Sequence, residues 1–189
     1  MQLVEKGDHE GILKLESKLV LRATALEGTE PQKASYIYLV IADALIATEF
    51  SSKKSRMKAI FLLERCFALS EIETFLNACV RELVPLYLKE GRHDEAFVII
   101  KRLTVRIPQH ELIEPNLILS MADELFQACL YDRGIEILTM FLGTINRSWD
   151  KEKRAAAYLA FGEGYTGLAE YEKAASFLHK ALAITDDPE

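Results

Sequence analysis

Apolar residues recur along the chain at intervals of three and four positions, the spacing that places side chains on one face of an α-helix. No stretch of useful length alternates apolar and polar residues as a half-buried strand does. Short polar or glycine-containing segments interrupt the pattern. We therefore expect about nine helices, at residues 9–27, 31–50, 53–69, 71–90, 93–107, 114–129, 131–145, 151–168 and 171–185.

Several of these boundaries carry local start and stop signals. Thr29 with Gln32, and Ser70 with Glu73, have the spacing of a capping box, in which each side chain bonds an amide that the first turn leaves unpaired. Gly91 follows a long apolar stretch, where a residue in the left-handed conformation often ends a helix. These signals predict helix starts near residues 30 and 71 and a helix end near residue 90.

The composition agrees with a helical fold. The 189 residues include 9 Gly and 5 Pro, fewer turn-forming residues than a sandwich or barrel requires. Half of the residues are hydrophobic and 28% are charged, as in a globular protein with a full core. No linker or low-complexity segment divides the chain. We expect one all-α domain over residues 1–189, with a helix or partial repeat at 1–30 and helix pairs at 31–70, 71–110, 111–148 and 149–189.

The last helix pair contains a recognisable repeat. Residues 158–165 read YLAFGEGY, and residues 169–174 read AEYEKA. This segment closely resembles the tetratricopeptide repeat (TPR), which has a Trp, Leu, Gly, Tyr, Ala and Phe slot in that order. In this chain the six slots hold Tyr158, Phe161, Gly162, Tyr165, Ala174 and Leu178.

The same frame recurs upstream. The two small-residue slots lie 12 positions apart in three copies, at Val84 and Ala96, Ala122 and Gly134, and Gly162 and Ala174. They lie 17 apart in the first copy, at Ala42 and Ala59, so we expect about five extra loop residues there. The resemblance implies helix hairpins that cross closely at the small slots, with Gly162 at the last crossing. It also implies that the hairpins stack into a right-handed superhelix.

The resemblance implies that the first helix of each pair lines a concave groove. One slot holds Leu39, Leu119 and Leu159, which predicts an apolar stripe, and another holds Asp43, Asp123 and Glu163, which predicts an acidic row. A solvated surface with incidental charges is the alternative interpretation. The candidate groove residues are Tyr36, Leu39, Asp43, Ile46, Arg81, Leu88, Asn116, Leu119, Asp123, Phe126, Leu159 and Glu163.

Charge restricts the partners that we expect. The chain has 23 Lys and Arg against 29 Asp and Glu, a net charge of −6, and phosphate binding needs clustered cations, so we expect no nucleic-acid partner. One basic cluster, residues 53–58, is either a solvated helix start or a contact to an acidic partner. TPR co-chaperones that hold an acidic peptide use Lys, Asn and Arg on the groove face. Those cations are missing here, so that activity is not expected.

No motif indicates catalysis. Residues 162–167 match the dinucleotide pattern G-x-G-x-x-G, but they lie inside an expected helix and not at a strand-to-helix turn. The four histidines lie in separate segments, and the three cysteines, without a Cys-x-x-Cys pair, suit reduced thiols. We expect no enzyme, metal or cofactor. With neither a secretory signal nor a long apolar run, we expect a cytoplasmic protein with no membrane partner.

We therefore expect a non-catalytic scaffold or adaptor that binds a protein or peptide in the groove, with a basic or amphipathic ligand segment. The alternative is self-assembly. Residues 9–27 and 171–185 are the end helices, and they carry apolar side chains where the ends of a solenoid normally present polar ones. In that case the solenoid ends pair, for example as a homodimer through the terminal helices. Mass in solution separates the two expectations.

Overall fold

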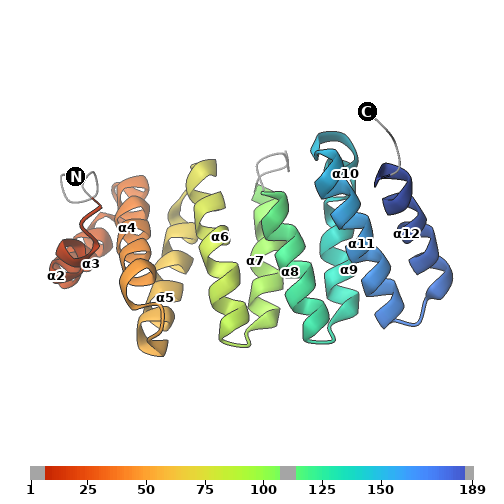
Figure 1. Ribbon diagram of the computed structural model, residues 1–189. Helices are drawn as coiled ribbons and strands as arrows, with labels where there is room; N and C mark the ends of the chain where they lie inside the picture. Colours follow the sequence, from red (N-terminus) through yellow and green to blue (C-terminus); the bar gives the residue numbers. More distant parts are fainter. Residues whose placement is uncertain (1–6, 107–113, 186–189) are drawn as a thin grey trace. The chain divides into compact units, whose positions relative to one another are not determined.

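The computed structural model describes residues 7–106 and 114–185 (Figure 1). Of these residues 85% are helical and none forms a strand, so the all-α prediction is confirmed. The helices within the described part of the chain are α2 (His9–Lys14), α3 (Glu16–Leu26), α4 (Pro31–Glu49), α5 (Lys53–Leu69), α6 (Glu73–Lys89), α7 (His93–Arg106), α8 (Pro115–Gln127), α9 (Tyr131–Met140), α10 (Leu142–Ser148), α11 (Lys151–Gly167) and α12 (Tyr171–Thr185).

The described residues form eleven helices where we expected about nine, because two expected helices are each interrupted at one residue. Residues 9–27 break at Leu15, and residues 131–145 break at Phe141. At each break the backbone N–H bonds the carbonyl three residues back, at 3.0 Å for Leu15 and 3.2 Å for Phe141. One tightened turn changes the helix direction without disturbing the apolar spacing, so the pattern gives no sign of it.

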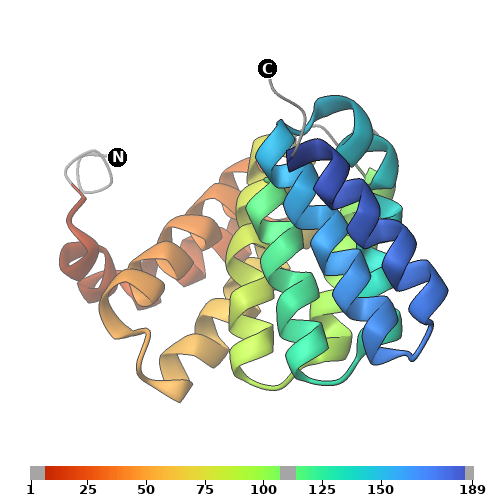
Figure 2. The ribbon, with the colours of Figure 1, turned by 45° about the vertical axis from the view of Figure 1, so that its right-hand side comes forward.

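The chain divides into two compact units, Met1–Leu103 and Thr104–Glu189, with the boundary inside α7. In the first unit α4 packs against α2, α3 and α5, and α5 also packs against α6. In the second unit α8 packs against α9, and α11 packs against α8, α9 and α12. Figure 2 shows the α11–α12 pair in blue. The single domain that we expected stays a prediction.

Three helix pairs are joined by the same turn. Each connection has three residues, and the middle one lies in the left-handed region: Gly91 at φ 70°, Cys129 at φ 59° and Ala169 at φ 59°. The next N–H then bonds a carbonyl five residues back, which is the Schellman arrangement. These bonds join Arg92 to Tyr87 at 2.8 Å, Leu130 to Leu125 at 2.8 Å and Glu170 to Tyr165 at 2.9 Å.

The five extra residues of the first helix pair lengthen its helices and not its loop. The connection of α4 to α5, residues 50–52, is as short as the connection of α11 to α12, residues 168–170. Instead α4 ends seven residues after its slot at Ala42, whereas α11 ends five residues after Gly162. Likewise α5 begins six residues before its slot at Ala59, whereas α12 begins three residues before its own. The expected long loop is therefore wrong, because helical spacing continues through the inserted residues.

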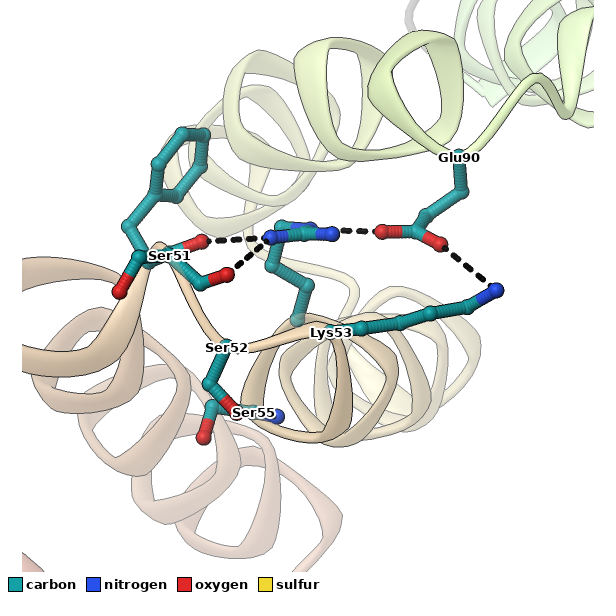
Figure 3. Close-up of polar contacts among 7 residues, drawn as sticks. Ser51, Ser52, Lys53, Ser55 and Glu90 are labelled. Atoms are coloured by element: carbon teal, nitrogen blue, oxygen red, sulfur yellow. Dashed lines mark hydrogen bonds and ion pairs between the residues drawn. The ribbon is translucent and has the colours of Figure 1, made fainter.

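Figure 3 shows Lys53, at the start of the lengthened α5, beside Glu90 at the end of α6. The start of α5 is held by Arg56. Its guanidinium donates to the carbonyl oxygens of Phe50 and Ser51, at 2.9 Å each, and to the carboxylate of Glu90 at 2.6 Å. The Lys53 ammonium lies 3.8 Å from the other Glu90 oxygen. The side chains of Arg56 and Glu90 are 12% and 6% exposed. This nearly buried ion pair joins the α4–α5 turn to the end of α6.

Neither predicted capping box forms. The N-cap residues of α4 and α6 are Glu30 and Ile72, and neither accepts a side-chain cap bond. The side chains of the two boxes meet each other, because Gln32 accepts a hydrogen bond from Ser70 at 3.5 Å. Ser70 in turn accepts the N–H of Ile72 at 3.1 Å. A tertiary contact between the starts of α4 and α6 has replaced two local ones.

All eight small-slot residues are buried, as the repeat frame predicts. Gly162 lies where α11 packs against α12, and a Cβ there would come within 2.6 Å of Cδ2 of Leu178. Two more glycines admit an aromatic ring. A Cβ at Gly164 would lie 2.8 Å from both Phe126 and Ile135, and one at Gly134 would collide with the same Phe126 ring. These glycines allow the helices of the second unit to approach.

We predict opposite outcomes for alanine at two positions of α11. Gly164→Ala should destabilise the protein by about 1–3 kcal/mol, since Phe126 and Ile135 are buried and cannot turn outward into solvent. Gly162→Ala should lower the free energy of unfolding by less. Leu178 is 38% exposed and can turn outward, and alanine adds about 1 kcal/mol of helix propensity. Thermal unfolding of both variants checks the order. Gly143→Ala is the control, since the nearest atom to a Cβ there is 3.5 Å away.

The turn at Ala169 generates a second prediction. An L-residue with a side chain is strained by about 1–2 kcal/mol in the left-handed region, so Ala169→Gly should stabilise the protein by about 1 kcal/mol. The same change at exposed Ala175, inside α12, should destabilise it by about 1 kcal/mol through lost helix propensity. Urea unfolding curves measure both. Equal signs for the two variants would contradict the assigned turn.

Candidate functional site

The candidate residues of the first unit lie on α4 and α6, and not all of them are exposed. Tyr36 is 37% exposed, and its ring stacks on Phe75 of α6 with centroids 5.9 Å apart. Asp43 and Arg81 are exposed, whereas Ile46 and Leu88 are half-buried and Leu39 is buried. The available surface on these helices is therefore aromatic at one end and charged two turns further along.

Asp43 is the ionisable group of this face whose environment is most unusual. Water reaches it, but surrounding protein atoms displace much of its hydration, and this desolvation together with the charge of Glu82 raises its pKa to about 6. The positive charges of Arg81 and His9 oppose the shift without cancelling it. Asp43 makes no hydrogen bond or ion pair with another described residue. Its carboxylate is thus a poorly stabilised anion.

Sequence reasoning missed two residues of this face, Phe75 and Glu82. The groove frame assigned other positions of α6, yet Phe75 is the residue that stacks on Tyr36, and the charge of Glu82, like that of the assigned Arg81, acts on Asp43. A signal was present: both helices carry an aromatic residue seven positions before an acidic one. Once the rings of Tyr36 and Phe75 are in contact, equal spacing on two helices that run in the same direction brings the two acidic residues to the same level.

The candidate residues of the second unit lie on α8 and α11. Asn116, Asp123 and Glu163 are exposed, Leu119 is half-buried and Leu159 is 51% exposed. Gln127 donates a hydrogen bond to Asp123 at 2.9 Å. Phe126 is 3% exposed and belongs to the interior, where it fills the space left by Gly134 and Gly164.

The basic cluster at residues 53–58 takes part in interactions inside the first unit. Arg56 and Lys53 pair with Glu90, as described above, and Lys58 pairs with Glu16 of α3. Lys54 is exposed. The structure thus assigns most of the cluster to joining α5 to α3 and α6, a role that neither sequence interpretation included.

The structure supports the packing interpretation of residues 162–167. They lie inside α11, where Gly162 and Gly164 are buried and a Cβ at Gly167 would collide with the ring of Tyr131. Within residues 7–106 and 114–185, no group of three or more His, Cys, Asp or Glu side chains could hold a metal ion. None of the helices described in those ranges is long and apolar enough to cross a membrane.

No protein-family model and no curated protein matches the sequence. Solved structures do match. A MamA protein has a TM-score of 0.62 at 15% identity, over 97% of this chain and 86% of its own. BtubC from P. vanneervenii has a TM-score of 0.62 at 14% identity, over 99% of this chain and 80% of its own. A structure of nearly identical TPR-like repeats of a Podospora anserina kinesin light chain has a TM-score of 0.60 at 18% identity, over 97% of this chain and 89% of its own. The chain has a TPR-like helical repeat fold.

The environment of Asp43 predicts a specific pH dependence of stability. Its pKa rises from 3.8 in the unfolded chain to about 6 in the folded protein, so the folded state binds more protons between those values. Stability from this group is present below about pH 4 and is lost as pH rises through 6. Asp43→Asn should therefore raise the melting temperature at pH 7.5, with a gain that shrinks towards pH 4.

Thermal melts across this pH range measure the effect. Asp132→Asn is the matched control, because Asp132 lies exposed in the first turn of α9, where a carboxylate is favourable. It should not stabilise the protein at any pH. A melting temperature of Asp43→Asn at or below that of the wild type at pH 7.5 would contradict the assigned environment.

Proposed function

We propose that the chain is a non-catalytic scaffold or adaptor in which each unit by itself offers a surface for a protein or peptide segment: the exposed faces of α4 and α6 in the first unit, and those of α8 and α11 in the second. The observation that carries this proposal is the pairing of exposed apolar and acidic side chains on these faces. Tyr36 accompanies Asp43 in one unit, and Leu159 accompanies Glu163 in the other. Three free cysteines, two of them buried, are consistent with a cytoplasmic location.

The chemistry of these faces favours an amphipathic ligand with basic residues. Exposed aromatic and aliphatic side chains supply most of the binding free energy when they become buried. The acidic side chains speed encounter and set the register of a positively charged segment. Because those acids are exposed, their contribution should fall with added salt.

We predict that binding depends separately on the apolar and the acidic side chains. A peptide-display selection against the full chain supplies the ligands, and fluorescence anisotropy measures their affinity. Tyr36→Ser or Leu159→Ser should weaken binding by about tenfold or more at any salt concentration. The triple change Asp43→Asn, Asp123→Asn and Glu163→Gln should weaken it mainly at low salt.

Leu21→Ser is the matched control, because Leu21 is 72% exposed on α3, outside both faces. It should leave affinity unchanged. If the selected peptides bound all of these variants as tightly as the wild type, the faces would not be the binding surface.

The second candidate function is self-assembly, and one observation favours it. Tyr171, Leu178 and Leu182 are spaced seven and four residues apart, so they share one face of α12, and they are 67%, 38% and 56% exposed. Sedimentation equilibrium of the wild type and of Leu182→Glu tests it. A dimer that the substitution dissociates would support assembly through α12, and a monomer would leave the peptide-binding function.

A further inference from the structure

Two helices of the first unit present the same pair of side chains in register. Tyr36 precedes Asp43 by seven residues on α4, and Phe75 precedes Glu82 by seven residues on α6. Seven residues are nearly two helical turns, so each ring lies about 10 Å from its carboxylate on one face. Since α5 reverses the chain between them, α4 and α6 run in the same direction.

The contacts agree with this register. The Tyr36 and Phe75 rings stack at 5.9 Å with an angle of 28° between their planes. Two turns further along, the Glu82 charge acts on Asp43. Glu82 accepts a hydrogen bond from its neighbour Arg81 at 3.2 Å, whereas Asp43 has no such partner among the described residues. One end of the face is aromatic, and the other holds the carboxylates of Asp43 and Glu82, of which only Glu82 is paired within the described part of the chain, with Arg81.

We propose that this face binds an amphipathic helix of the partner, with a lysine or arginine side chain between Asp43 and Glu82 and an apolar side chain seven residues away against the Tyr36–Phe75 rings. A cation there offsets the repulsion between the carboxylates and replaces hydration that Asp43 has lost. Helical spacing matches because positions i and i+7 share a face about 10 Å apart. This inference rests on the proposed function and specifies what its ligand must carry.

The site is also sensitive to pH. The ionisable groups that act on Asp43 are Glu82 and Arg81 on α6 and His9 on α2. As pH falls through 6, Asp43 takes up a proton and the cation loses one of its two anionic partners. Only about a tenth of Asp43 is ionised one pH unit below its pKa, so affinity should fall by about tenfold between about pH 7.5 and pH 5.

Designed helical peptides test the proposal on the full chain without a known partner. The first probe is an alanine-rich helix with one Phe and one Lys at i and i+7, and two others carry Gln at i+7 or move the Lys to i+5. All lack histidine. Fluorescence anisotropy at about pH 7.5 should show the first probe binding about tenfold tighter than the other two, as expected for a hydrogen bond to a charged group. Equal affinities would overturn the proposal.

Variants separate the site from a general charge effect. Asp43→Asn should remove both the preference for Lys and the pH response, and Glu172→Gln on α12, with the same change in net charge, should keep both. Glu82→Gln should move the midpoint of the pH response to lower pH, because desolvation then raises the pKa of Asp43 without the added repulsion from Glu82. A pH response that survives in Asp43→Asn would show that another group causes it and would overturn our assignment.

The display-selected peptides distinguish this inference from the proposed function. If peptides that depend on Tyr36 show no preference for a cation at i+7 and no Asp43-dependent pH response, the inference is wrong and the scaffold function remains. If no selected peptide binds these faces, the proposed function itself is wrong.

Discussion

Close approach of paired helices is the constraint on which the rest of this structure depends. Two helices approach closely where the side chains at their crossing are small, and of the eight slot residues, all of them buried, seven are Gly or Ala and the eighth is Val84. The second unit goes further, because Gly134 and Gly164 leave space for one buried ring, that of Phe126. Phe126 therefore belongs to the core although its slot suggested a binding face.

Polar contacts reinforce this packing in the first unit. Glu27 accepts hydrogen bonds from Tyr38 at 2.6 Å and from Arg65, and these donors lower its pKa. The network joins the end of α3 to α4 and α5. Tyr87 donates to Glu64 at 2.6 Å, which together with burial raises the pKa of the tyrosine. Three charged residues of α5, namely Arg56, Glu64 and Arg65, therefore bond side chains at the end of α3 or of α6. These contacts join α5 to its neighbours.

The sequence predicted those parts of the fold that depend on regular spacing. Most helix bounds follow from periodicity, the small slots follow from the resemblance to the tetratricopeptide repeat, and Gly91 ends α6 in the left-handed region as expected. Tertiary contacts decided the rest. Ser70 is a residue type that often caps a helix, but its hydroxyl accepts the N–H of Ile72 and donates to Gln32, and α6 begins two residues beyond the expected start. Phe75 escaped detection for a similar reason, because its partner Tyr36 is 39 residues away and periodicity within one helix cannot reveal a pair across two.

The two kinds of polar group in the first unit differ in a way that bears on function. Glu27 and Glu90 have cationic partners, so their charges contribute to the fold. Asp43 has no such partner, and its ionised form is held at a cost near neutral pH. If position 43 served only the core, an apolar residue there would avoid the cost of the charge. If it were fully solvated, an ionised Asp would carry no such cost. A cation supplied from outside the chain would offset it, and so Asp43 and not the better-paired acids marks the surface on which a ligand is expected.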